Sequence, residues 1–181
     1  MAIVAVLGAS FSLREIEPNP CNIKIAKEAV RICEKLTKQG HIPVLVVQWE
    51  LDLALSELGK LIEGCSWKEI IHQGGWAYSV IGQYDDGRYL GTGELVNEAL
   101  PFFEEFNATH FVAVANPFIH QQYTYWLARK HFKLMFRKVK WIGFDKESTQ
   151  RWCRSWWRFA YQTVRLALGL SHGHDGRQAK A

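Results

Sequence analysis

Short apolar runs alternate along the chain with longer segments in which apolar residues recur at helical spacing. In the runs nearly every position is apolar, a pattern typical of strands that are buried on both faces of a parallel sheet. In the longer segments apolar residues lie three and four positions apart, which places them along one side of a helix. The pattern predicts strands at residues 3–8, 42–48, 68–72, 110–115 and 139–144.

Helical periodicity follows each of these strands. The predicted helices are residues 22–39, 51–62, 93–107, 120–131 and 146–168. Asn22 and Thr92 are predicted to be N-caps, because short polar side chains bind the free N–H groups at a helix start. Residues 74–93 hold six glycines and show no sustained period, so we interpret them as a long loop.

The alternation of buried strands with helices predicts the fold class. We expect an α/β fold, a three-layer Rossmann-like sandwich with a mostly parallel five-stranded sheet and helices on both faces. No internal repeat or linker divides the chain. Residues 1–170 are therefore predicted to form one domain, followed by a flexible polar tail at residues 171–181.

Composition narrows the class of protein. Hydrophobic residues make up 48% and charged residues 22% of the 181 positions, which indicates an ordinary globular chain and excludes intrinsic disorder. The apolar start has no basic leader and is shorter than the roughly 20 residues of a spanning helix, so no membrane or export segment is predicted. Four cysteines without a C-x-x-C pair favour a reducing compartment and a cytoplasmic location. Cys33 and Cys153 are interpreted as small apolar core residues.

Charge is distributed unevenly along the chain. Residues 1–120 hold nine Lys and Arg against fifteen Asp and Glu, whereas residues 121–181 hold thirteen against three. This polarity indicates that the C-terminal third faces something anionic, or faces the acidic part of another copy of the chain.

Polar residues directly follow several of the predicted strands. In an open parallel sheet, ligands bind beside the carboxyl ends of the strands, so these residues are candidates for ligand binding. They are Gly8, Ser10, Gln48, Gln73, Gly74, Gly75 and Asn116. Ser10 offers a hydroxyl and Gly74-Gly75 a backbone nest for an anion, although ordinary turns explain both. G-x-G-x-x-G and P-loop patterns are absent, which excludes the standard dinucleotide and P-loop sites.

The candidate for proton transfer is His120, which opens a helix directly after a strand and titrates near neutral pH. Glu94 and Asp85 are candidate acidic partners. Glu94 is equally well explained as a favourable charge at a helix start, and Asp85 as part of a solvated turn. The sequence shows no three-ligand metal pattern and indicates no particular cofactor.

The final predicted helix carries a basic stripe beside two aromatic faces. The stripe is Arg151, Arg154, Arg158 and Arg165; one face holds Trp152, Trp156, Phe159 and Thr163, and the other Trp157, Tyr161, Val164 and Leu168. We expect the aromatic side in the core or at its rim and the basic edge outside. That edge is either a solvated face or a surface for an anionic ligand, an acidic partner or a membrane. No nucleic-acid-binding motif is present, so nucleic acid is not an expected partner.

Several short motifs spread along the chain are shared with a known family. They are Val6-Leu7-Gly8, Thr92-Gly93-Glu94, the segment from His110 through Asn116-Pro117-Phe118 to His120, and Trp156-Trp157-Arg158-Phe159. In these the chain resembles the YdcF/SanA/ElyC-type family, a bacterial group whose chemistry is largely unassigned. The resemblance implies a Rossmann-like fold. The chain departs from the family in three ways: Gln73-Gly74-Gly75 is its nearest equivalent of Ser-Gly-Gly, Gln121 and Gln122 replace a basic residue after the histidine, and the membrane-anchoring segment of some members is not predicted.

Two hypotheses of function follow. In the first, the strand ends bind a small anionic, phosphorylated or nucleotide-like molecule, in a binding protein or in a transferase or hydrolase that uses His120. In the second, the chain is not an enzyme, and its basic aromatic C-terminal helix docks an acidic partner or a second subunit.

Overall fold

The computed structural model describes residues 1–11, 19–61, 74–82, 90–116, 119–135, 143–148 and 151–167. Five features of the sequence analysis lie wholly or mostly outside these residues: the strands predicted at 68–72 and 139–144, Gln73, Asp85 and the tail at 171–181.

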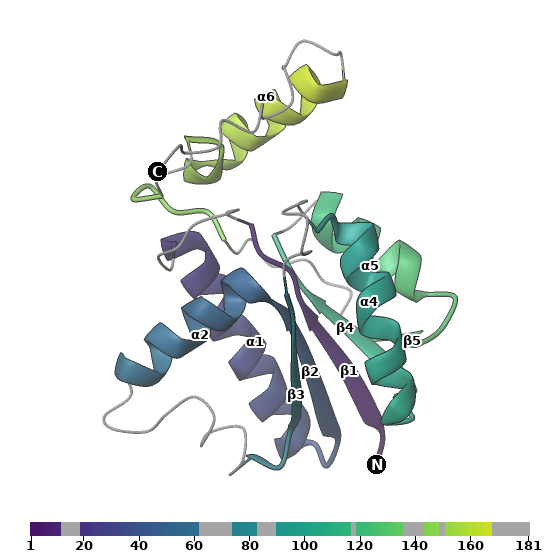
Figure 1. Ribbon diagram of the computed structural model, residues 1–181. Coiled ribbons are helices and arrows are strands. Elements are labelled where there is room, and N and C mark those ends of the chain that lie inside the picture. The colour runs from purple at the N-terminus through teal and green to yellow at the C-terminus, as the bar shows by residue number, and fades with distance from the viewer. Residues whose placement is uncertain are drawn as a thin grey trace.

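One parallel sheet organises the chain (Figure 1). Its strand order is β3-β2-β1-β4-β5, and every neighbouring pair is parallel. The strands are β1 (Ile3–Gly8), β2 (Ile42–Gln48), β3 (Ala77–Ile81), β4 (His110–Val114) and β5 (Lys133–Leu134). The predicted α/β class with a five-stranded sheet is confirmed, and the sheet is parallel throughout.

Helices cover both faces of the sheet (Figure 1). They are α1 (Pro20–Lys38) and α2 (Trp49–Leu61) on one face, and α4 (Thr92–Glu105) and α5 (Ile119–Ala128) on the other. Alternate residues of β1 serve the two cores: Val4 and Val6 face α1 and α2, whereas Ala5 and Leu7 face α4 and α5. All four are fully buried, which explains why the strand has no polar position.

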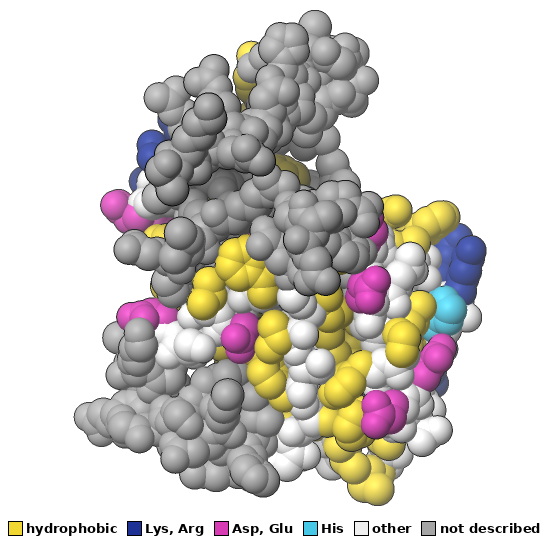
Figure 2. Space-filling model, in the orientation of Figure 1, with side chains coloured by type: hydrophobic (Ala, Val, Ile, Leu, Met, Phe, Trp, Pro, Cys, Tyr) yellow, Lys and Arg dark blue, Asp and Glu magenta, His cyan; other side chains and the backbone are white. Residues whose placement is uncertain are grey.

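The two outer strands differ from the prediction. β3 lies inside residues 74–93, which the sequence analysis interpreted as a loop. Among the described strands it pairs with β2 alone, and its side chains are half-buried or exposed, so it lacks the apolar run of a central strand. Figure 2 shows hydrophobic side chains along this part of the surface, between α2 and α4, with single acidic side chains among them. β5 is two residues long and precedes the segment predicted as the last strand.

Helix starts also differ in detail from the prediction. The N-cap of α1 is Asn19 rather than Asn22: its side chain accepts the N–H of Cys21, and Pro20 occupies the first helical position, where a missing N–H costs nothing. The N-cap of α4 is Gly91 rather than Thr92, and the Glu94 carboxylate accepts the Gly91 N–H at 2.8 Å.

The predicted C-terminal helix is broken in two. A 3₁₀ helix, η1 (Arg151–Arg154), is followed by α6 (Trp156–Ala167). Ser155 separates them and starts α6, because its hydroxyl accepts the N–H of Arg158 and its carbonyl accepts the N–H of Phe159. Both elements lie beyond the carboxyl ends of the strands (Figure 1). No helix in the described part of the chain is long and apolar enough to cross a bilayer.

Two phenylalanines near the end of α4 test the packing against β4. Phe103 is 1% exposed and meets Phe111 and Phe132 edge to face. Phe103→Ala should lower the free energy of unfolding by about 3–5 kcal/mol. Phe106, which is 36% exposed, is the matched control: Phe106→Ala should cost about 1 kcal/mol or less. Urea unfolding measures both, and equal losses would contradict this packing.

Candidate functional site

The strand order reverses at β1 and β4. From β1 the chain continues through α1 to β2 on one side, and it returns to β4 on the other side. At such a reversal the loops leaving two adjacent strands diverge, which is where open α/β sheets bind ligands. Ser10 follows β1 and Asn116 follows β4, so two of the predicted ligand-binding residues lie at this reversal, at the carboxyl ends of the two strands.

Buried polar side chains gather at the same edge. In the described segments they are Ser10, Asn19, Asn22, Gln48, Glu50, Asn116, Gln121, Thr124 and Ser148. Most of them lie at the end of a strand, directly after one, or near the start of a helix, and Ser148 belongs to the segment leading into η1; Thr124, in the middle of α5, is the exception. The buried positions inside β1 and β4, in contrast, are apolar.

Ser10, Gln48 and Glu50 form a hydrogen-bonded cluster between the ends of β1 and β2. The backbone N–H of Ser10 donates to Gln48 Oε1 at 3.2 Å, and its hydroxyl donates to Glu50 Oε2 at 3.3 Å. Gln48 Nε2 donates to the carbonyl of Leu90 at 3.4 Å. The three side chains belong to residues that are each 2% exposed, so Ser10 and Gln48 contact one another beneath the surface.

His120 lies at the start of α5 and contacts Thr92 at the start of α4. Its Nδ1 is 3.1 Å from the Thr92 hydroxyl. Rings of Phe11 and Phe159 lie 6.4 and 6.2 Å from the imidazole, centre to centre. Burial lowers the pKa of His120, because the charged imidazolium loses its hydration. The ring is therefore neutral at neutral pH and able to accept a proton.

An aromatic cluster attaches the C-terminal segment to this edge. Phe11, directly after β1, meets Phe144 and Phe159 at centroid distances of 5.2 and 5.3 Å. Two thiols lie beneath it: Cys21 contacts the carbonyl of Cys153 at 3.6 Å, and Cys153 contacts that of Phe11 at 3.6 Å. Hydrogen bonding with the Cys153 side chain lowers the pKa of the Cys21 thiol. The segment containing η1 and α6 thus covers part of the candidate site.

The expectation that Cys33 and Cys153 are buried is confirmed, since both are 0% exposed. Cys33 lies in α1, and burial raises the pKa of its thiol. A raised pKa disfavours the thiolate, so Cys33 is not suited to nucleophilic chemistry.

Gln121 offers an acceptor that the sequence analysis did not assign to the site. Its Nε2 donates to the Ala113 carbonyl at 3.1 Å, and its backbone N–H donates to the Asn116 carbonyl at 3.2 Å. Its Oε1 is buried and has no hydrogen-bond partner among the described residues. The sequence signal was limited to a glutamine beside His120 in place of a basic residue.

Other predicted site residues lie elsewhere or serve the fold. Gly74 and Gly75 precede β3, which places them at the opposite, amino edge of the parallel sheet. Gly8 allows α2 to approach, because a Cβ there would lie 3.0 Å from Leu51 and Val47 side-chain atoms. Glu94 is exposed and caps α4. None of these three features joins the Ser10–Gln48–Glu50 cluster or His120.

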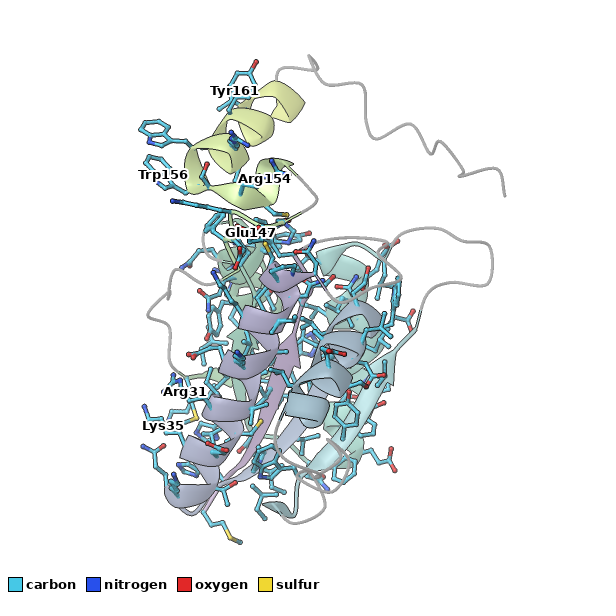
Figure 3. The ribbon with its side chains drawn as sticks, turned by 90° about the vertical axis from the view of Figure 1, so that its left-hand side faces the viewer. Arg31, Lys35, Glu147, Arg154, Trp156 and Tyr161 are labelled. Carbon is cyan, nitrogen blue, oxygen red and sulfur yellow. The ribbon has the colours of Figure 1, made fainter. Side chains whose placement is uncertain are left out.

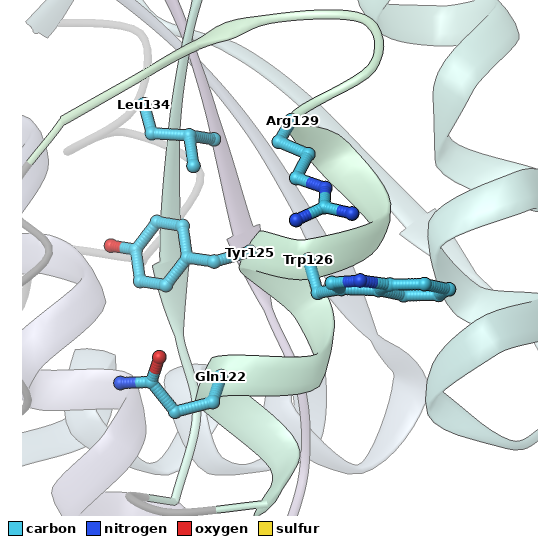
Figure 4. Close-up of a pocket in the computed structure, with 5 residues that line it drawn as sticks. All are labelled: Gln122, Tyr125, Trp126, Arg129 and Leu134. Carbon is cyan, nitrogen blue, oxygen red and sulfur yellow. The ribbon is translucent and has the colours of Figure 1, made fainter.

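A cavity of about 330 Å³ lies on the outer side of α5 (Figure 4). Its lining is Gln122, Tyr125, Trp126, Arg129 and Leu134. None of the predicted site residues belongs to it. Gln122, Trp126 and Arg129 are exposed, so the cavity is an open surface groove. Within the described residues, no group of three His, Cys, Asp or Glu side chains is arranged to hold a metal ion.

Comparison of the chain with protein-family models, with curated proteins and with solved structures found no match. The resemblance to the YdcF/SanA/ElyC-type family therefore stays a prediction from short motifs.

Burial of His120 predicts a pH dependence of stability. Because its pKa is lowered in the folded protein, the unfolded chain binds more protons below pH about 6.5. The contribution of the neutral imidazole to the free energy of unfolding is therefore fully present above pH about 6.5. This contribution is lost as the pH falls from about 6.5 towards the lower pKa that His120 has in the folded protein. His120→Gln should therefore flatten the fall in unfolding free energy between pH 7.5 and pH 5.5. The exposed His131 provides the control: His131→Gln should keep the wild-type slope, and an unchanged slope in His120→Gln would show that the imidazole is not buried.

Proposed function

We propose that the carboxyl edge of the sheet binds a small anionic, nucleotide-like molecule. One observation supports this most strongly: apart from Thr124, the buried polar side chains of the described chain lie at strand ends, near helix starts or in the segment leading into η1, while the buried positions inside β1 and β4 are apolar.

The free energy of burial explains why that distribution favours a binding site. Taking a polar group out of water costs free energy unless it is hydrogen-bonded, and a carboxyl group costs more than an amide or hydroxyl. Glu50 is a buried acid at the end of β2, and Gln121 keeps a buried carbonyl oxygen without a partner among the described residues. The helix dipole at the start of α2 offsets part of this cost for Glu50, whereas nothing among the described residues offsets it for the Gln121 oxygen, so the fold alone does not account for that group.

The chemistry of the edge suits a molecule with hydroxyl groups and a negative charge. Glu50 follows β2, and Rossmann-type folds use an acid after a strand to accept the hydroxyls of a ribose; this comparison is an analogy of fold. Helices α1, α4 and α5 begin at the same carboxyl edge of the sheet. The positive ends of their dipoles favour an anion, so the ligand's charge is held without Gly74 and Gly75.

His120 supplies the reactive group in this proposal. A neutral imidazole accepts a proton from a hydroxyl or a water molecule, and the Thr92 hydroxyl at 3.1 Å fixes the orientation of its ring. Such a site serves a transferase or hydrolase in which His120 is the general base.

A thermal-shift screen with nucleotides, S-adenosylmethionine and sugar phosphates tests this function. A ligand at 100 times its dissociation constant should stabilise the protein by about 2.7 kcal/mol. For any ligand found, Ser10→Ala should weaken binding about tenfold, the effect of one hydrogen bond to a charged group. Ser79→Ala on β3 is the matched control and should leave affinity unchanged. A screen without a stabilising ligand, or a ligand equally well bound by Ser10→Ala and His120→Gln, would contradict the proposal.

A further inference from the structure

Helix α6 has two apolar faces: one packs against the domain, and the other is exposed on the surface. Phe159 is 8% exposed and packs in the aromatic cluster with Phe11. Trp157, Tyr161 and Val164 are 67%, 65% and 55% exposed. Their spacing of four and three residues aligns them in one stripe, which at 100° per residue lies opposite Phe159. We call these three residues the outer stripe.

The outer stripe corrects the prediction that the aromatic side of this helix is buried. Trp156, at its edge, is 41% exposed and stacks on Trp157 with ring centres 3.9 Å apart. Figure 3 shows Trp156 and Tyr161 projecting from α6 away from the strands. Three aromatic side chains on a single twelve-residue helix form the kind of exposed apolar surface that marks a contact with another body.

Basic residues accompany the outer stripe. Arg158 follows Trp157 and is exposed, and Arg154 lies one turn earlier, where its Nε donates to the Ser148 carbonyl at 2.7 Å. Residues 121–181 hold thirteen Lys and Arg against three Asp and Glu. A partner that complements the outer stripe therefore has a negatively charged surface and an apolar layer below that surface.

We propose that the outer stripe of α6 docks on the surface of an anionic lipid bilayer, with the helix axis parallel to the membrane. Trp and Tyr combine an apolar ring with a hydrogen-bonding N–H or O–H, which suits the depth of the lipid headgroups. Arginine binds phosphate groups through its guanidinium. Aromatic and basic residues on the outside of a short amphipathic helix are the features of interfacial membrane binding.

The observations favour a bilayer over a second copy of the chain. A contact between two outer stripes brings two positively charged regions together, which costs free energy. Elsewhere in the described residues, Ile42, Val80 and Phe106 are single exposed apolar side chains on separate parts of the fold. Tyr123 and Trp126 form a second exposed aromatic pair, on α5, and the side chains of Arg129 and Lys130 lie against the Trp126 ring. That pair is therefore basic like the outer stripe, and a contact between the two would again bring positive charges together.

Vesicle co-sedimentation of the full chain tests this proposal. The protein should bind vesicles of equimolar phosphatidylcholine and phosphatidylglycerol and bind phosphatidylcholine vesicles much more weakly. Trp157→Ser should lower the partition coefficient about tenfold, the effect of one large side chain losing its apolar contact. Arg158→Glu should lower it about tenfold or more, because the charge at the surface changes by two.

Matched variants separate the stripe from general effects of aromatic content and charge. Trp126→Ser removes a 46% exposed tryptophan of α5, and Lys27→Glu reverses an exposed charge on α1; both should bind like the wild type. Tyr161→Ser is a second stripe variant, for use if Trp157→Ser lowers the thermal midpoint.

Three results would overturn the proposal. They are the absence of wild-type binding to the anionic vesicles, equal binding to both vesicle types, and stripe variants that bind like the controls. Sedimentation velocity identifies the alternative occupant: self-association that Trp157→Ser abolishes, without vesicle binding, would make the stripe a subunit contact. The proposal does not rest on the ligand site at the strand ends.

Discussion

Burial of β1 on all sides is the constraint on which the rest of the structure depends. The strand is hydrogen-bonded to β2 on one side and to β4 on the other, and helices cover both of its faces. No position along it tolerates a polar side chain, so polar groups are confined to its ends. At the carboxyl end, β1, β2 and β4 terminate in register, and Ser10 after β1 contacts Gln48 and Glu50 at the end of β2. The location of the candidate site is thus a consequence of the central position of β1.

The C-terminal segment packs against the same carboxyl edge of the sheet. Phe11 leaves the end of β1 as an apolar ring, and Phe144 and Phe159 cover it. These contacts of Phe11 therefore fix both the position of the C-terminal segment above the candidate site and the direction of the α6 axis. With Phe159 turned inward, the geometry of the helix places Trp157, Tyr161 and Val164 outward. The candidate site and the outer stripe are parts of the same arrangement, one beneath the C-terminal segment and the other on its outer side.

The sequence predicted the central strands well and the outer ones poorly, for a physical reason. β1, β2 and β4 are buried on both faces, so their apolar runs are unambiguous. β3 and β5 are paired on one side in the described sheet, and their short, partly exposed sequences carry no such run. Because β3 was not predicted, the position of Gly74 and Gly75 directly before a strand, at the amino edge of the sheet, was missed.

For the site, the strand-end rule found Ser10, Gln48, Asn116 and His120, but spacing along the chain revealed none of their contacts. Helical periodicity likewise identified the faces of the C-terminal helix without showing which face is buried, since both are aromatic. The central claim is that the polar groups of this edge are retained for a ligand rather than for the fold. Glu50 tests it most directly, as the buried acid of the cluster. Measured by urea unfolding at neutral pH, Glu50→Gln should be as stable as the wild type or more stable, because a buried carboxyl costs more than an amide. A loss of more than about 2 kcal/mol would contradict the account, since it would show that the carboxyl group stabilises the fold itself.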